Sequence, residues 1–296
     1  MLPDNKEKDT SITYKTNYIR IIMKRLNLLL VALMVFGLAF SRVQVDTISV
    51  FSAKMKKEVK SVVILPENYT IKKHYPVVYL LHGYGDNYAT WLKTVPAIKT
   101  QSTEYQFIIV CPDGGYSSWY FDSPIDPAYQ YETFITKDLL AYVDAHYATI
   151  PNRTGRAITG LSMGGHGALY LAIRNRELFG NAGSMSGGVD LRSSTRLFDI
   201  SKRIGTIELN HEEWDNRSVI NLVNDLKIGQ LNLVIDCGVS DIFYLINAGL
   251  HRRLMSLKID HDYIERPGEH NWKYWANAIE YQFLYFDKHF DKEKKK

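Results

Sequence analysis

The sequence predicts an α/β fold in which helices cover both faces of a mostly parallel central sheet. Short, uninterrupted apolar segments such as "VVYLL" and "FIIVC" are typical of strands that are buried on both faces. Segments with apolar residues at helical spacing lie between them, and this alternation indicates successive β-α-β units. With 296 residues, of which 46% are hydrophobic, the chain can form one sizeable core.

The expected elements follow one another along the chain. An antiparallel hairpin comes first, because two strand-like segments flank a charged turn. Residues 190–229 are more polar and irregular, so we expect this short insertion to form a cap over the site. The expected strands are the hairpin within 45–69 and then 77–81, 107–115, 156–162, 181–188, 231–238 and 261–268. The expected helices are 87–103, 131–146, 164–174, 218–226 within the insertion, 242–257 and 272–290.

The N-terminal residues indicate processing rather than folding. Residues 23–41 combine a charged start, an apolar run and small residues near Ser41, which is the pattern of a cleaved signal peptide. The apolar run of about 15 residues is shorter than the ~20 that span a bilayer, which disfavours a membrane anchor. Because signal peptides rarely begin so far inside a chain, we interpret Met23 as the start and residues 1–22 as an extension outside the native protein. Residues 42–296 then form a single domain, periplasmic or secreted, with no stable membrane anchor after processing.

The charge and the cysteine content narrow the function further. The chain carries 36 Lys and Arg against 32 Asp and Glu, and its first 41 residues hold six of the former and three of the latter, so the predicted domain has a net charge of +1. A near-neutral domain gives no electrostatic basis for nucleic-acid binding. No motif for a metal, a nucleotide or another cofactor is visible. Cys111 and Cys237 each close an apolar strand and are expected to be small buried hydrophobic residues, although a disulfide between them is possible in an exported protein.

The segment "ITGLSMGGHGA" predicts an activated serine. It places Ser162 in a G-x-S-x-G motif between an expected strand and an expected helix. The turn is so tight that Gly160 and Gly164 must lack side chains, and it holds Ser162 in a strained conformation above the carboxyl edge of the sheet. The helix that begins at Met163 directs its amino end toward the reaction centre. A chance match is the alternative, but the strand before the motif and the helix after it favour the functional interpretation.

A nucleophilic serine needs a general base, and the base needs an orienting acid. After a turn of this kind the partners follow in the order acid, then histidine. His270 lies in the loop before the final helix, which is where the base is expected. Asp236 and Asp241 are both candidates for the acid. Asp241 is preferred because it lies in the loop beyond the strand end, whereas Asp236 is still within the strand.

Acyl transfer also needs two hydrogen-bond donors for the developing oxyanion. The backbone N–H of Met163, directly after the nucleophile, is the first. The second is expected from the loop "LLHGYGD" after strand 77–81, where the N–H of Tyr84 is the preferred donor. His82 of the same loop is expected to be structural.

Five motifs occur in a recognisable order: "LLHGYGDNYATW", "CPDGGYSSWYFDSP", "GLSMGGHGAL", "CGVSDIFY" and "PGEHNWKYW". Together they resemble the esterase-D-like α/β-hydrolases, which include feruloyl and acetylxylan esterases of carbohydrate esterase family one, tributyrin esterases, S-formylglutathione hydrolases and mycolyltransferases. The resemblance covers residues 45–290 and implies an α/β-hydrolase fold with the triad Ser162, Asp241 and His270 and an oxyanion donor at Tyr84. One departure is "GVSD", where many relatives carry Glu or Thr beside the aspartate.

Aromatic residues are candidates for substrate binding. Trp119 and Tyr120, in "SSWYFDSP", follow a strand end, where the ligand crevice of a parallel sheet is expected. Their rings could stack on an aryl or sugar group. Trp272 is a third candidate, and core packing is the alternative for all three.

The leading hypothesis is an exported serine carboxylesterase without a cofactor. Its expected substrates are small acyl or aryl esters, with feruloyl or acetyl esters of plant polysaccharide first. One alternative is a thioesterase of the S-formylglutathione hydrolase kind, whose cytosolic substrate fits poorly with a signal peptide. An acyltransferase would use the same triad. A noncatalytic sugar-binding module on this scaffold is disfavoured, because every triad position holds a competent residue.

Overall fold

The computed structural model describes residues 18, 20, 22–25 and 43–290. The chain divides into two units, residues 1–42 and 43–296, and the fold described here belongs to the second. Most of the predicted signal peptide and most of the extension before it lie outside the described residues. Among the helices of the described part, none combines the length and the apolar character that crossing a membrane requires.

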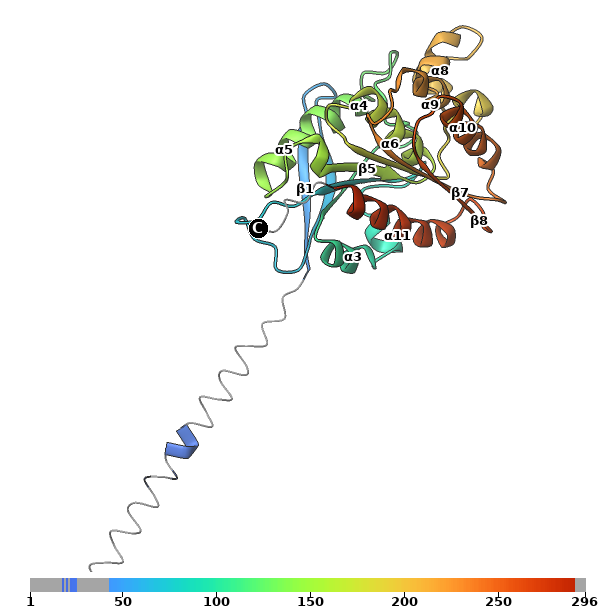
Figure 1. Cartoon of the computed structure of the whole chain (residues 1–296). Coiled ribbons are helices and arrows are strands. Elements are labelled where there is room, and N and C mark those ends of the chain that lie inside the picture. The colour runs from blue at the N-terminus through green and yellow to red at the C-terminus, as the bar shows by residue number, and fades with distance from the viewer. Residues whose placement is uncertain (1–17, 19, 21, 26–42, 291–296) are drawn as a thin grey trace, which may run out of the picture. The chain divides into compact units, whose positions relative to one another are not determined.

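In the described residues, eight strands form one sheet with the order β1-β2-β4-β3-β5-β6-β7-β8 (Figure 1). β1 pairs antiparallel with β2, and β2 with β4, while all other neighbours pair in parallel. The predicted hairpin and mostly parallel sheet are therefore confirmed. The strands are β1 (Gln44–Ser52), β2 (Lys57–Leu65), β3 (Val77–Leu81), β4 (Ile108–Pro112), β5 (Arg156–Gly160), β6 (Asn181–Met185), β7 (Asn232–Gly238) and β8 (Asp262–Arg266).

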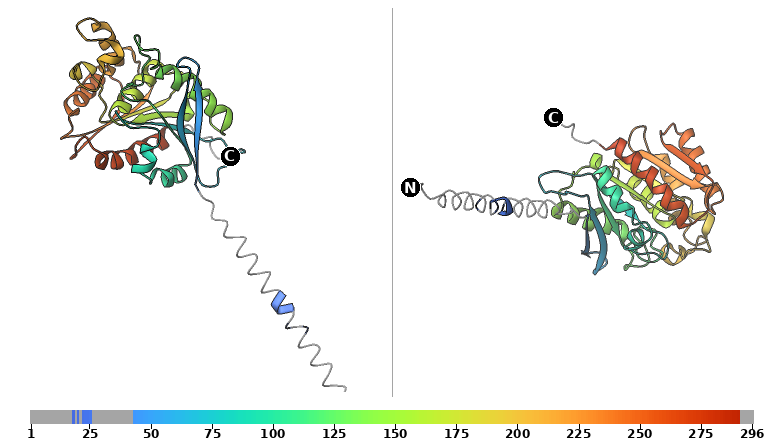
Figure 2. Two further views of the ribbon diagram at one scale, coloured as in Figure 1. Left: turned by 180° about the vertical axis from the view of Figure 1, so that it is seen from behind. Right: turned by 90° about the horizontal axis from the view of Figure 1, so that it is seen from below.

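Helices cover both faces of the sheet, as Figures 1 and 2 show. The side chains of β3 alternate between two apolar cores: Val77 and Tyr79 join α5 and α6 on one face, and Val78 and Leu80 join α3 and α11 on the other. This is why the strand reads as an unbroken apolar run. The helices are α2 (Thr90–Thr94), α3 (Ile98–Tyr105), α4 (Tyr131–Thr133), α5 (Leu140–His146), α6 (Met163–Arg174), α7 (Ser201–Ile204), α8 (His211–Arg217), α9 (Val219–Leu222), α10 (Tyr244–Ser256) and α11 (Trp272–His289).

Two expected helices differ from their predictions. The helix predicted for residues 87–103 is split into α2 and α3, because Pro96 disfavours helical backbone at Val95, which has φ −126° and ψ 68°. The helix predicted for residues 131–146 is continuous, but its middle, Phe134–Leu139, forms a π-helix between α4 and α5. In the insertion at residues 190–229, α9 falls within the helix expected at residues 218–226, whereas α7 and α8 were not expected. Trp214 of α8 is buried.

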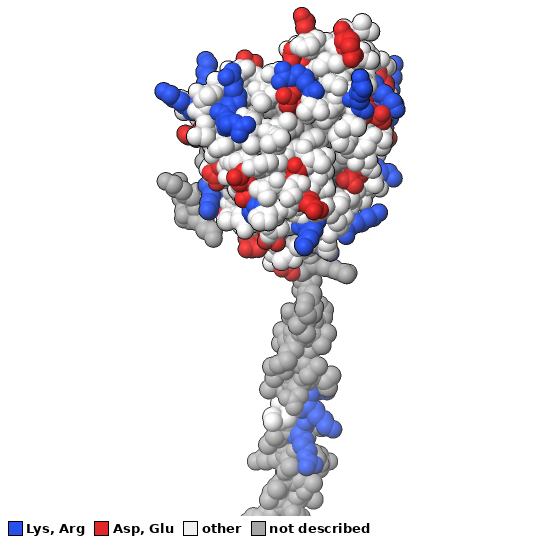
Figure 3. Space-filling model, turned by 90° about the vertical axis from the view of Figure 1, so that its right-hand side faces the viewer, with Lys and Arg blue, Asp and Glu red and all other residues white. Residues whose placement is uncertain are grey.

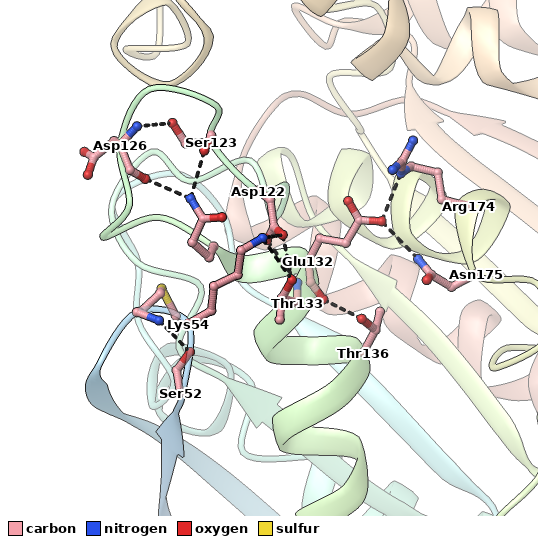
Figure 4. A network of polar contacts seen from close by, with 12 residues as sticks. Ser52, Lys54, Asp122, Ser123, Asp126, Glu132, Thr133, Thr136, Arg174 and Asn175 are labelled. Carbon is pink, nitrogen blue, oxygen red and sulfur yellow. Dashed lines mark hydrogen bonds and ion pairs between the residues drawn. The ribbon is translucent and has the colours of Figure 1, made fainter.

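A network of polar contacts holds the loop between β4 and α4 (Figure 4). Lys54, in the turn of the β1–β2 hairpin, pairs with Asp122 at 2.6 Å, and the Thr133 hydroxyl donates to the same carboxylate at 2.6 Å. Glu132 pairs with Arg174 at the end of α6, with 2.9 Å between Oε1 and Nε. The network thereby ties the loop that carries the predicted substrate residues to the β1–β2 hairpin, and it ties α4 to α6.

Candidate active site

The site lies at the carboxyl edge of the parallel strands, where the loops after β3, β5, β7 and β8 meet. Ser162 follows β5, Asp241 lies between β7 and α10, and His270 lies between β8 and α11.

The face shown in Figure 3 carries Lys and Arg interspersed with Asp and Glu, without a large patch of one sign.

The turn that carries Ser162 is strained, and glycines make it possible. Ser162 has φ 54° and ψ −116°, a conformation that a residue with a side chain rarely adopts. A Cβ on Gly160 would lie 2.6 Å from the Leu81 carbonyl oxygen, and a Cβ on Gly164 would lie 2.6 Å from the His82 carbonyl oxygen. Both neighbouring atoms belong to backbone that cannot move away cheaply, so only glycine fits at these two positions. The Ser162 side chain makes no helix cap at α6, which leaves its hydroxyl free for other partners.

Three side chains form a continuous hydrogen-bonded chain. Ser162 Oγ lies 2.9 Å from His270 Nε2, and His270 Nδ1 lies 3.0 and 2.9 Å from the two carboxylate oxygens of Asp241. The Asp241 side chain is fully buried and also accepts a 2.7 Å hydrogen bond from the Phe243 N–H. A carboxylate at Nδ1 holds the proton on that nitrogen, so that Nε2 can accept the proton of the serine hydroxyl. The three residues that were selected from chain order are thus brought together.

Asp236, the less favoured candidate for the acid, lies apart from the hydrogen bonds that join Ser162, His270 and Asp241. Its buried carboxylate binds the Arg266 guanidinium at 2.5 Å and the Tyr274 hydroxyl at 2.5 Å. Both of its oxygens therefore have other partners.

The loop after β3 passes beside Ser162. A Cβ on Gly83 would lie 3.7 Å from Ser162 Cβ. His82 Nε2 accepts a hydrogen bond from the Gly114 N–H at 2.7 Å, so the proton of the neutral ring is on Nδ1, which donates to the Gly83 carbonyl at 2.8 Å. That carbonyl and the Tyr84 N–H belong to the same peptide plane. His82, which is buried, therefore fixes the orientation of the expected oxyanion donor.

The aromatic rim predicted at Trp119 and Tyr120 is wrong. Their side chains are only 1% and 0% exposed, so neither offers a ring face to a substrate. Trp119 Nε1 donates to the Phe198 carbonyl at 3.2 Å, and the Tyr120 hydroxyl donates to the His82 carbonyl at 3.1 Å. Both residues have positive φ, 55° and 60°, and this left-handed backbone accompanies the inward direction of both rings.

Four other aromatic rings form a row that leads outward from His270. The rings of Phe243 and His270 meet edge to face at 5.2 Å between centroids, and Phe198 lies 5.8 Å beyond Phe243. Tyr84 follows at 5.6 Å and Tyr116 at a further 4.7 Å, where the side chain is 51% exposed. We call Phe243, Phe198, Tyr84 and Tyr116 the aromatic row. Sequence reasoning missed Phe198, which lies in the insertion without a motif, whereas Phe243 could have been found from its position two residues after Asp241.

The remaining candidates have structural surroundings. Trp272 is half-buried at the start of α11 and meets the rings of Trp91 and Trp275 edge to face, at 5.0 and 5.6 Å. A role in substrate binding stays a prediction for this residue. Cys111 and Cys237 are buried free thiols, and burial raises the pKa of both. In the described part of the chain, no three His, Cys, Asp or Glu side chains cluster in a way that could hold a metal ion.

The sequence of this chain was compared with protein families and with known proteins. The family model described as "Putative esterase" matches residues 52–286. The chain belongs to this esterase family. An acetyl esterase of Caldicellulosiruptor saccharolyticus is 27% identical over 259 residues, which cover 79% of this chain and 96% of that protein. An esterase of Mycobacterium tuberculosis is 38% identical over 134 residues, which cover 44% of this chain and 29% of that protein. The chain therefore spans less than a third of that longer esterase.

Solved structures show the same α/β-hydrolase fold. A ferulic acid esterase superposes with a TM-score of 0.72 and 26% identity, covering 84% of this chain and 100% of that one. The S-formylglutathione hydrolase of Staphylococcus aureus superposes with a TM-score of 0.72 and 22% identity, covering 83% of this chain and 100% of that one.

Proposed function

We propose that this chain is a serine carboxylesterase. The observation that carries the proposal is the chain of hydrogen bonds from Asp241 through His270 to Ser162, on a strained strand–helix turn, in a member of an esterase family. Nothing in this arrangement requires a cofactor, since proton transfer and nucleophilic attack are both within the reach of these side chains.

The geometry suggests the following steps. His270 Nε2 takes the proton of the Ser162 hydroxyl while Oγ attacks the ester carbonyl carbon, and the backbone N–H groups of Met163 and Tyr84 stabilise the oxyanion. His270 then returns the proton to the leaving alcohol, which leaves an acyl group on Ser162. A water molecule, deprotonated by the same nitrogen, releases the acid and restores the serine. Asp241 holds the ring and stabilises the imidazolium in both halves of the reaction.

We infer that the substrate is a small acyl or aryl ester, with feruloyl or acetyl esters of plant polysaccharide first. Two findings support this choice: one similar structure is a ferulic acid esterase, and one similar protein is an acetyl esterase. The aromatic row adds physical support, since its rings lie between His270 and the surface and could pack against an aryl group. Export through a signal peptide at residues 23–41 would bring the enzyme to such a substrate, and N-terminal sequencing of the protein from its native host tests that part.

The deciding experiment compares the wild-type chain with Ser162→Ala. We expect the variant to lose on the order of 10⁴-fold or more in kcat on p-nitrophenyl acetate. Its circular dichroism and unfolding midpoint should stay close to those of the wild type, because the change removes only a hydroxyl group that makes no cap to α6. Turnover at the wild-type rate by the variant would contradict the mechanism. A panel of methyl ferulate, acetylated xylan and S-formylglutathione then separates an esterase from a thioesterase.

A further inference from the structure

Asp236 is a buried acid for which the proposed reaction has no use. It lies on β7, its side chain is fully buried, and each carboxylate oxygen has its own donor. Arg266 Nη2 lies 2.5 Å from Oδ2, and the Tyr274 hydroxyl lies 2.5 Å from Oδ1. A buried carboxylate persists only when such partners replace its lost hydration, so this trio forms one unit.

The two partners of Asp236 flank the loop that carries His270. Arg266 is the last residue of β8, and Tyr274 lies in the first turn of α11. One carboxylate therefore holds both ends of the segment 267–273. The ring of Tyr274 also packs directly against this segment, since a Cβ on Gly268 would overlap Tyr274 Cδ2.

Backbone hydrogen bonds also join the segment 266–268 to the loop that carries Asp241. The Val239 N–H donates to the Arg266 carbonyl at 2.9 Å, and the Ser240 N–H donates to the Gly268 carbonyl at 2.9 Å. A Cβ on Gly238 would overlap the Gly268 carbonyl oxygen, so the two loops are in direct backbone contact. A shift of either end of the His270 loop would consequently change the distances from His270 to both Asp241 and Ser162.

We propose that Asp236, through Arg266 and Tyr274, is a positioning residue that sets His270 in line with Ser162 and Asp241. This inference rests on the proposed function. Catalysis by a hydrogen-bonded triad is sensitive to small displacements, and a misplacement of about 1 Å can lower the rate on the order of 10²-fold. Removal of the Asp236 carboxylate should therefore lower kcat by a much larger factor than it changes KM.

A second ion pair, between α5 and β5, provides a matched control. Asp144 pairs with the buried guanidinium of Arg156, the first residue of β5, and accepts a 2.7 Å hydrogen bond from the Thr149 hydroxyl. This pair lies at the amino end of β5, whereas Ser162 follows its carboxyl end. Asp144→Asn, like Asp236→Asn, removes a carboxylate that is bound by an arginine and a hydroxyl, although the Asp144 side chain is partly exposed and that of Asp236 is fully buried. The change does not touch the loops that carry Ser162, Asp241 and His270.

The experiment measures Asp236→Asn, Tyr274→Phe and Asp144→Asn beside the wild type. The readouts are kcat and KM on p-nitrophenyl acetate, the rate at which diethyl p-nitrophenyl phosphate phosphorylates Ser162, and the unfolding midpoint. We expect Asp236→Asn to lower kcat and the phosphorylation rate by roughly 10- to 100-fold, with KM changed by less than about threefold. Tyr274→Phe should lower both rates by a smaller factor. Asp144→Asn should lower the unfolding midpoint but keep both rates within about twofold of the wild type.

The possible outcomes separate the two proposals. If the organophosphate does not label the wild-type serine, the proposed function fails. If the wild type is labelled and Asp236→Asn is labelled equally fast, the function stands and the positioning role is overturned. Rate losses that follow the loss of stability equally in Asp236→Asn and Asp144→Asn would also overturn it. Should Asp236→Asn fail to fold, two variants of its partners replace it. Arg266→Lys keeps a cation beside Asp236, whereas the double variant Arg266→Ala with Tyr274→Phe removes both partners. The positioning role predicts a higher kcat for Arg266→Lys than for the double variant, and equal kcat values would overturn it.

Discussion

At the scale of single residues, the space around Ser162 is set by backbone atoms of β3 and the loop after it. The Leu81 and His82 carbonyls approach the turn so closely that Gly160 and Gly164 have no room for a side chain. By contrast, a Cβ on Gly249, inside α10, would have only Ile220 Cδ1 within 4 Å, at 3.7 Å. Replacement by alanine should therefore have opposite effects on stability at the two kinds of position.

We expect Gly164→Ala to destabilise the fold by about 1–3 kcal/mol, as overpacking does, and to reduce activity by displacing Ser162. Gly249→Ala should instead stabilise it by about 0.5–1 kcal/mol, because alanine favours a helix interior. Urea denaturation of both variants measures the two values. A Gly164→Ala variant as stable and as active as the wild type would show that the turn is not constrained in this way.

The choice of acid gives a second prediction at this scale. Asp241→Asn should lower kcat by about 10⁴-fold, because an amide no longer holds the imidazole proton on Nδ1. Asp236→Asn should lower it far less, since Asp236 contacts Arg266 and Tyr274 and not His270. Steady-state kinetics on p-nitrophenyl acetate with both folded variants provides the comparison. The reverse order of the two losses would assign the acid to Asp236.

The residues of the triad could be selected from sequence because chain order and loop position restrict them, and their catalytic role stays a prediction. Chain order and loop position could not predict the direction of the Trp119 and Tyr120 side chains. It accompanies positive φ at both residues and contacts with Phe198 and His82, which lie far away in the chain or on another loop. No local pattern in "SSWYFDSP" shows these partners.

At the scale of elements, the insertion between β6 and β7 shapes the entrance to the site. Its residues Phe198 and Asp199 both have positive φ, and Asp199 accepts a 3.2 Å hydrogen bond from the Tyr84 hydroxyl. The insertion is thus tied to the loop of the expected oxyanion donor. It also places Phe198 in the middle of the aromatic row.

The aromatic row should discriminate between substrates. We expect Phe198→Ala to lower kcat/KM on methyl ferulate by roughly tenfold more than on p-nitrophenyl acetate, whose acyl group has no ring to pack. Leu197→Ala is the matched control, because Leu197 is the adjacent apolar residue and is 57% exposed. It should affect the two substrates equally. Equal losses for Phe198→Ala would show that the ring serves packing and not recognition.

The elements themselves were largely predictable, and one of the exceptions has a clear local cause. Continuous apolar runs identified the buried strands, and β3 begins and ends at the predicted residues. The break at Pro96 follows from the restriction that proline places on the preceding residue and was overlooked. The π-helix at Phe134–Leu139 lies inside a segment that was expected to be helical, and the apolar spacing does not distinguish the two kinds of helix. In the insertion the helix at residues 218–226 was expected, whereas α7 and α8 were not.

At the scale of the whole molecule, one buried histidine joins three parts of the fold. His166 of α6 is fully buried, with Nδ1 3.1 Å from the Trp119 carbonyl oxygen and Nε2 2.8 Å from the Arg217 carbonyl oxygen. It therefore connects the central helix with the loop after β4 and with the insertion. Burial lowers the pKa of His166 to about 4, although the two carbonyl contacts act in the opposite direction.

This pKa predicts how global stability depends on pH. An unfolded histidine titrates near 6.5, so between about pH 6.5 and 4 the unfolded chain binds a proton at this position that the folded chain does not. The free energy of unfolding should then fall as the pH is lowered through this window, by up to about 1.4 kcal/mol per pH unit from this group, and the contribution should be fully retained above the window.

His166→Asn has no titrating ring and keeps one donor for a carbonyl. Urea denaturation of both proteins at several pH values isolates the effect, because the carboxylates that titrate in the same range are common to both. The stability difference between wild type and variant should narrow or reverse toward pH 4, and a difference that is constant from pH 7 to pH 4 would show that His166 keeps its proton equilibrium on folding.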